Sequence, residues 1–319
     1  MDHLGYVLAA VLYTECLAGI MVNMVILAAI FLKWKTHRSL QTIYKILGCL
    51  SLSRCLYLLS VLFHYIIVVF HPWVLLGTIF VTAIQVEIMF LYYTNLWFAT
   101  ILCVFYCVKI TSYNNSLWIF LKMKISTVIS WFLLASLLFS VSSSFSFGFN
   151  MFNLEPESLL NSTIEYMTVY NNGTIIHYQK RLLIFLIGSC PPFLIFCVTI
   201  CLLLHSLWMH TRRMRSSGSN FRCPNLESHF SAVKSMSLFL VLQMIYFIVT
   251  IVSIAGRMYD YNVWRLVLPI ISCSSLFLHS FHIISSNSDL KKTCLSVLHA
   301  IRGELESWKS PVHVIISVV

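Results

Sequence analysis

Seven long apolar stretches divide this chain of 319 residues, and each contains at least 20 residues. An α-helix rises about 1.5 Å per residue, so a stretch of ~20 residues crosses the ~30 Å hydrocarbon core of a bilayer. Backbone polar groups find no water there, which leaves helices and closed barrels as the structures that can span it. The sequence therefore predicts an all-α membrane protein built as a bundle of seven transmembrane helices. The predicted spans are Tyr6–Leu32, Ile43–Phe70, Phe80–Val108, Ile125–Phe149, Leu182–Trp208, Ser231–Ala255 and Val263–Ser286.

Basic residues lie almost entirely on one side of these spans. Of the 21 Lys and Arg residues, 17 lie on the side opposite the N-terminus, counting Arg54 inside the second span. The exceptions are Lys180, Arg181, Arg257 and Arg265. Loops rich in Lys and Arg stay in the cytoplasm when a membrane protein inserts. We therefore expect a multi-pass plasma-membrane protein with an extracellular N-terminus and a cytoplasmic C-terminus.

The composition excludes a soluble domain. Hydrophobic residues make up 59% of the chain and charged residues only 10%, against ~25% charged residues in soluble domains. The net charge of +10 is concentrated on the predicted cytoplasmic side, where it suits anionic lipid headgroups and acidic partners. We therefore expect membrane lipid as a partner and no nucleic acid.

The segment after the seventh span repeats apolar residues at helical spacing. Charged residues between them make the other face polar, which is typical of a helix that lies in the membrane interface. The sequence thus predicts a seven-span bundle at 1–286 and a cytoplasmic tail with a short amphipathic helix at 287–319. Cys294 on this helix is a candidate for palmitoylation, with packing as the alternative. The repeating positions are Leu290, Cys294, Val297, Leu298, Ile301 and Leu305.

The largest extracellular segment is expected at residues 150–179. It contains the tripeptides Asn161-Ser-Thr and Asn172-Gly-Thr. Both match the Asn-x-Ser/Thr acceptor for N-linked glycans, and both lie on the side that the charge pattern places outside. We therefore expect glycosylation at Asn161 and Asn172.

Arg54 is the most unusual polar residue, because it lies about 12 residues inside the second span. An ionisable group at the bilayer centre costs ~2.5–3.5 kcal/mol on insertion scales and needs a partner or a role. Asn23 in the first span and the His279-Ser280 pair in the seventh are the predicted neighbours. Two compatible interpretations stay open: a structural polar network that fixes helix packing, or the same network rearranging on activation.

Glu87 is the second intramembrane charge that needs an explanation. It lies in the outer third of the third span. Its carboxylate either holds the cationic group of a ligand or faces an aqueous vestibule.

The sequence gives no sign of catalysis, of a metal site or of a cofactor. It contains no nucleophile elbow, phosphate-binding loop or paired carboxylates. The twelve histidines lie mostly in loops, tails or span edges, and those within spans differ in depth. The pairs Cys103/Cys107 and Cys197/Cys201 are interpreted as small packing residues. We therefore expect a protein that is not an enzyme.

Several motifs along the chain resemble those of the type 2 (bitter) taste receptors, a family of seven-transmembrane G-protein-coupled receptors. They occur in the family's order over about residues 23–290. The acidic-Arg pair and the Asn-Pro…Tyr box of rhodopsin-like receptors are missing. The motifs are Leu52-Ser53-Arg54, Trp97-Phe98-Ala99-Thr100, Phe105-Tyr106-Cys107-Val108-Lys109-Ile110, Leu121-Lys122, Ser206-Leu207-Trp208-Met209-His210-Thr211-Arg212 and His279-Ser280.

By this resemblance, small bitter compounds enter from outside into a pocket between the spans. Many family members have Asn where Tyr92 stands, so the pocket here is expected to be tighter, with different hydrogen bonding. The implied ligand-binding residues are Tyr65, Ile88, Met89, Tyr92, Tyr246, Val249 and Thr250.

The resemblance also implies a heterotrimeric G protein of the gustducin/Gi type as the cytoplasmic partner. The residues implied to face it are Tyr106, Lys109, Lys122, His210, Arg212 and Arg213.

Two other classes of protein share parts of this pattern. A vomeronasal type 1 receptor also has a short N-terminus, but the Trp97 and Lys122 motifs argue against it. A seven-span transporter or channel calls for more charges facing the bundle axis than Arg54 and Glu87 provide.

Overall fold

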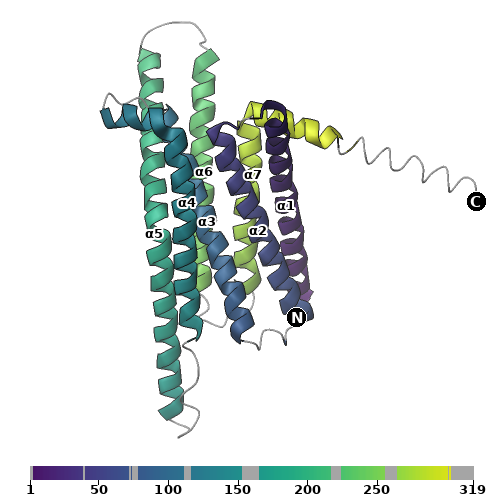
Figure 1. The fold of residues 1–319 in the computed structure, drawn as a ribbon. Coiled ribbons are helices and arrows are strands. Elements are labelled where there is room, and N and C mark those ends of the chain that lie inside the picture. Colours follow the sequence, from purple (N-terminus) through teal and green to yellow (C-terminus); the bar gives the residue numbers. More distant parts are fainter. Residues whose placement is uncertain are drawn as a thin grey trace, which may run out of the picture.

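The computed structural model describes residues 3–38, 40–71, 73, 78–110, 116–152, 165–216, 224–255, 264–300 and 302. Within these ranges the protein is a bundle of seven long helices and contains no strand (Figure 1). All seven are long and apolar enough to cross a bilayer, which confirms the predicted fold. The helices are α1 (His3–His37), α2 (Thr42–Phe70), α3 (Thr78–Ile110), α4 (Ser116–Phe152), α5 (Glu165–Ser216), α6 (Pro224–Ala255) and α7 (Trp264–Ser286).

The helices are longer than the predicted spans, most of all α5. α4 continues to Phe152 and α5 begins at Glu165, so the segment expected as a loop at residues 150–179 is helical at both ends. Each residue added to a nucleated helix contributes a backbone hydrogen bond, so the helix continues past the last apolar residues. Hydropathy marks the lipid boundary and misses these turns. Asn172 accordingly lies within α5, whereas Asn161 lies outside the described residues.

α3 is the most buried helix of the bundle and α4 the least buried. α3 borders α2, α4 and α5, while α7 packs between α1 and α6. The N-terminus and the segment after α7 lie at opposite ends of the bundle (Figure 1). α3 is therefore the helix best placed to line a site inside the bundle.

A further helix follows α7 at residues 288–300, as predicted. Asn287 separates the two helices, and its side-chain oxygen caps the new one by accepting a hydrogen bond from the backbone N–H of Leu290 at 3.0 Å. Leu290, Cys294 and Val297 pack into a buried cluster with residues of α1 and α2. Burial raises the pKa of the Cys294 thiol to about 11. These observations favour packing over palmitoylation for Cys294.

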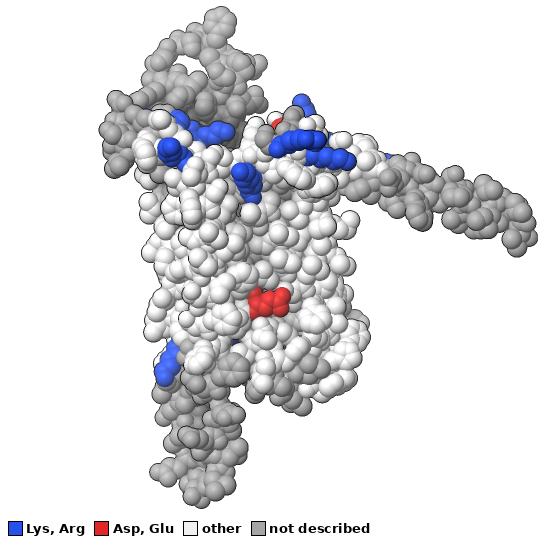
Figure 2. All heavy atoms as spheres, viewed as in Figure 1, with Lys and Arg blue, Asp and Glu red and all other residues white. Residues whose placement is uncertain are grey.

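Basic side chains gather at the end of the bundle that carries this C-terminal helix. On the face drawn in Figure 2, few Lys or Arg residues lie at the other end, and the broad middle is mostly uncharged. The folded chain therefore keeps the charge asymmetry that the sequence predicts, with an apolar belt between its two ends.

Candidate ligand-binding and activation sites

A cluster of aromatic side chains brings together five of the seven predicted ligand-binding residues. The rings of Tyr92 on α3 and Tyr246 on α6 have centroids 5.2 Å apart. Phe185 on α5 lies 5.3 Å from Tyr92, and Tyr57 on α2 lies 6.3 Å from Tyr246, both between ring centroids. We call this set the aromatic cluster. It consists of Tyr57, Met89, Tyr92, Tyr93, Phe185 and Tyr246, with Tyr65 and Ile88 packed against it.

The two remaining predicted residues, Val249 and Thr250, lie one turn further along α6. Both are buried. The hydroxyl of Thr250 donates to the backbone oxygen of Tyr246 at 2.8 Å, so its hydrogen is used within its own helix. Thr250 still lies near the hydroxyl of Tyr92, whereas Val249 packs outside the aromatic cluster.

Three members of the aromatic cluster, Tyr57, Tyr93 and Phe185, were not predicted. Tyr57 lies eight residues before Tyr65, two turns along the same helix face. A Cβ added at Gly188 on α5 would lie 2.9 Å from the Tyr93 ring, so this glycine makes room for it. The spacing of Tyr57 and Tyr65 and the presence of Gly188 are visible in the sequence. They predict contacts only once the rotation of each helix about its axis is known.

The hydroxyls of Tyr92, Tyr93 and Tyr246 are buried, and no described residue forms a hydrogen bond with them. That of Tyr92 lies near Thr250 and that of Tyr246 near Tyr57, without reaching hydrogen-bonding geometry. A buried polar group without a partner costs ~1–3 kcal/mol, which a ligand group that pairs with it recovers. The cluster thus combines apolar side chains with three unpartnered hydroxyls, a composition typical of small-molecule sites.

Arg54 joins α2 to α1 and α7 through buried side chains. Its Nη1 donates to the Ser280 hydroxyl at 2.9 Å, and its Nη2 contacts Nδ1 of His279. Ser280 in turn donates to Oδ1 of Asn23 at 3.0 Å. The structure therefore brings together the four residues that the sequence places at similar depth. The His279 ring also stacks on Phe239 at 4.2 Å between centroids, which extends the network to α6.

A second polar link, between α2 and α3, was not predicted. The hydroxyl of Ser53 donates to Oδ1 of Asn95 at 2.9 Å, and Nδ2 of Asn95 donates to the backbone oxygen of Leu91. Ser53 precedes Arg54 in the chain, and Asn95 lies three residues after Tyr92. This link therefore connects the aromatic cluster to the Arg54 network. The sequence feature that could have predicted this link is Asn95, because a polar side chain inside a span needs a hydrogen-bond partner.

Comparison with known proteins decides which family these features belong to. The sequence model of the taste receptor protein (TAS2R) family matches residues 1–302. This chain belongs to that family. Taste receptor type 2 member 39 of Rattus norvegicus is 29% identical over 308 residues, which cover 95% of both chains. Member 40 of Gallus gallus and member 2 of Homo sapiens are each 30% identical and cover 91% and 89% of this chain and 93% of their own.

Membership of the taste receptor family confirms the resemblance drawn from the motifs to the type 2 (bitter) receptors. The family is one of receptors rather than enzymes, and seven membrane-length helices agree with a multi-pass G-protein-coupled receptor. The vomeronasal, transporter and channel alternatives are set aside by the same finding.

The residues predicted to face a G protein lie at the basic end of the bundle, where the structure describes them. Lys109 in the last turn of α3, Lys122 on α4 and Arg212 near the end of α5 are exposed. Tyr106 is half-buried against the cluster that also holds the C-terminal helix. The side chains of two further predicted residues on α5, His210 and Arg213, lie outside the described part of the chain.

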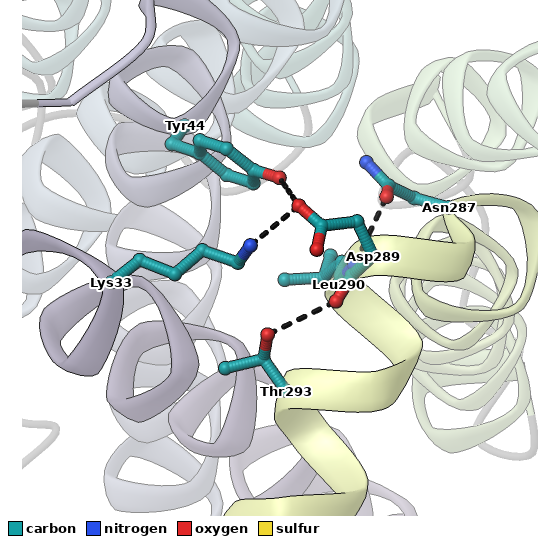
Figure 3. A network of polar contacts seen from close by, with 6 residues as sticks. All are labelled: Lys33, Tyr44, Asn287, Asp289, Leu290 and Thr293. Carbon is teal, nitrogen blue, oxygen red and sulfur yellow. Dashed lines mark hydrogen bonds and ion pairs between the residues drawn. The ribbon is translucent and has the colours of Figure 1, made fainter. Parts of the chain in front are cut away.

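Asp289 fastens the C-terminal helix of this taste receptor to the bundle (Figure 3). One oxygen of its carboxylate lies 2.5 Å from Nζ of Lys33 on α1 and accepts a hydrogen bond from the Tyr44 hydroxyl on α2 at 2.6 Å. The hydrogen bond from Lys33, and then that from Tyr44, hold the pKa of Asp289 below its ordinary value. The sequence did not predict this contact, because the residues are distant in the chain and meet only after α7 ends.

Proposed function

We propose that this chain is a chemosensory receptor that binds small, mostly apolar bitter compounds in the aromatic cluster and activates a heterotrimeric G protein of the gustducin/Gi type. It acts in the plasma membrane with its N-terminus outside and its C-terminus in the cytoplasm. The observation that carries the proposal is the set of three unpartnered tyrosine hydroxyls within an apolar cluster that adjoins the Arg54 network. The receptor has no resident cofactor in this proposal.

A ligand in the aromatic cluster affects the Arg54 network through α6 and α3, which both contribute residues to the cluster. A ligand shifts the inactive–active equilibrium only by its differential affinity for the two states. A ligand group that pairs with the Tyr246 hydroxyl changes how α6 packs against α3, and Phe239 lies two turns away on α6, stacked on His279. Displacement of α6 therefore alters the partners of Arg54 and opens the basic end to the G protein.

The proposal also predicts how tightly and how selectively the receptor binds its ligands. Its ligands gain mainly apolar contact and at most three hydrogen bonds in the aromatic cluster. Such ligands bind weakly and with broad selectivity, so agonists should act at roughly micromolar concentrations.

A calcium assay in cells with and without a taste-type G protein tests the proposal. Cells that display the receptor are challenged with a panel of bitter compounds, and surface labelling of both tagged termini checks orientation. We expect responses that require the G protein, and a changed set of active compounds for Tyr92→Asn. Ion flux without a G protein, or a C-terminal tag accessible on intact cells, contradicts the proposal.

The cytoplasmic arm of the proposal has its own test. Lys109→Ala and Arg212→Ala should lower agonist-driven nucleotide exchange on the G protein while agonist binding stays unchanged. The matched control is Lys180→Ala, which removes a basic side chain at the opposite end of the bundle. Equal loss of exchange in the control contradicts the assignment of this surface.

A further inference from the structure

A groove of about 500 Å³ runs between α3 and α4, separate from the aromatic cluster. Its walls include Val86 and Phe90 on α3 and Phe145 and Gly148 on α4. A Cβ added at Gly148 would lie 2.1 Å from the Val86 side chain, so the two helices approach closely here. Within the described part of the chain, Phe90 is the one residue that both lines the groove and packs against the aromatic cluster. The groove therefore lies outside the aromatic cluster, on the side of α3 that faces α4.

The groove opens away from the bundle. Its rim residues Ile79, Phe145 and Phe149 are exposed by 72%, 63% and 69%. In a bilayer, apolar side chains on the outside of a helix bundle face lipid. A molecule that enters this groove therefore arrives from the membrane.

Among the described residues that line the groove, Glu87 is the one acidic side chain. The membrane-length part of α3, Ile79–Ile110, has 32 residues. Centred on ~30 Å of hydrocarbon, a helix of ~48 Å places Glu87 only ~3 Å inside the outer boundary. One carboxylate oxygen accepts a hydrogen bond from Ser60 at 2.6 Å. Among the described residues, no Lys, Arg or His lies within ion-pair distance of Glu87.

We propose that this groove binds an amphiphilic amine that enters from the outer leaflet. The protonated ammonium pairs with the Glu87 carboxylate at the hydrocarbon boundary, and the apolar body lies between α3 and α4. The volume falls within the ~300–1,000 Å³ of small-molecule sites. Charge complementarity selects an amine, because an uncharged hydrophobe leaves Glu87 unpaired and a fatty acid brings a second carboxylate to it.

Equilibrium binding to the purified receptor in phosphatidylglycerol nanodiscs tests this site. The probe is tritiated N,N-dimethyl-4,4-diphenylbutylamine, and its uncharged carbon isostere 5-methyl-1,1-diphenylhexane is the comparison ligand. We expect saturable binding of the amine that falls about tenfold in Glu87→Gln, while binding of the isostere is unchanged. The matched control is Glu15→Gln. Glu15 is also an intramembrane carboxylate that accepts a serine hydrogen bond, from Ser274 at 2.8 Å, but it lies on α1, away from the groove.

A second variant tests the groove itself. Ala83 lines it with an exposed side chain, so Ala83→Phe fills the space without entering the contact at Gly148 and should abolish binding of both ligands. The inference is overturned if Glu87→Gln binds the amine like the parent, if Glu15→Gln loses it equally, or if binding does not saturate. These assays need no G protein, so they succeed or fail independently of the proposed signalling function.

Discussion

The guanidinium of Arg54 donates to the hydroxyl of Ser280 across 2.9 Å, which ties the middle of α2 to α7. Ser280 donates a hydrogen bond to Asn23 on α1, and His279 stacks on Phe239 of α6. The buried Arg54 guanidinium therefore links α1, α2, α6 and α7. The network lies beside the aromatic cluster on one side and leads toward the basic end on the other. A change in the packing of any of these helices therefore changes the hydrogen bonds of Arg54.

Arg54→Ala should abolish agonist signalling. The substitution removes both contacts to α7, at ~1.5–3 kcal/mol for each hydrogen bond to a charged group. Nδ1 of His279 then loses its Arg54 partner, and Ser280 keeps only its hydrogen bond to Asn23. Calcium responses normalised to surface expression measure the effect. Lys45→Ala is the control, because Lys45 is an exposed basic residue on the same helix. A fully active Arg54→Ala receptor contradicts the role of the network.

Tyr92→Phe should leave the receptor as stable as the parent, or more stable by about 1 kcal/mol, because it removes a buried hydroxyl that has no partner. Compounds with a hydrogen-bonding group should lose affinity for this variant, whereas purely apolar agonists should not. Thermal unfolding in detergent and concentration–response curves measure the two effects. A large drop in stability would mean that the hydroxyl is bonded within the protein.

Gly188→Ala should destabilise the receptor by ~1–3 kcal/mol, the range for overpacking a filled core. The new methyl group would lie 2.9 Å from the Tyr93 ring, and α5 has to move away from the aromatic cluster. Gly48→Ala is the matched control, because the nearest atom to its added Cβ, on Ile30, is 3.9 Å away. Unfolding midpoints of the two variants should differ clearly, with Gly48→Ala equal to the parent or higher. Equal midpoints contradict the close approach at Gly188.

Asp289→Asn should loosen the C-terminal helix. The pKa of Asp289 is depressed, so its carboxylate stabilises the docked helix above the ordinary carboxyl pKa, and this contribution is lost as the pH falls through the depressed pKa. Exposed ion pairs contribute at most ~1 kcal/mol, so loss of this one should make local opening of the helix up to about fivefold more frequent. Because opening exposes the buried Cys294, its alkylation should rise by the same factor. Mass spectrometry at Cys294 measures the rate, with Lys291→Ala as the control. No change in Asp289→Asn, or an equal rise in the control, contradicts the fastening role.

The sequence predicts some of these relationships because the membrane leaves few alternatives. A charge at Arg54 in the middle of a span needs polar partners at similar depth, and Asn23, His279 and Ser280 were the available ones. Tyr65, Met89 and Tyr92 could be placed by counting turns from motifs that resemble a known family. The helix bundle follows from span length alone.

Other relationships depend on how each helix is rotated about its axis, which periodicity in these nearly uniformly apolar helices does not fix. Phe185 and Tyr93 meet because Gly188 lets α5 approach α3. Glu87 lies at the α3–α4 groove because of how α3 is rotated against α4. Such packing depends on contacts between distant segments, and a single sequence gives no measure of them.

Nucleotide exchange on a purified Gi-type heterotrimer, driven by this receptor in nanodiscs, tests the central claim most directly. Exchange should rise with a bitter agonist at a micromolar half-maximal concentration. Tyr246→Ala should weaken agonist binding, whereas Arg54→Ala should keep agonist binding and lose exchange. If agonist-stimulated exchange persists in both variants with unchanged potency, the aromatic cluster is not the ligand site and Arg54 does not transmit its occupancy.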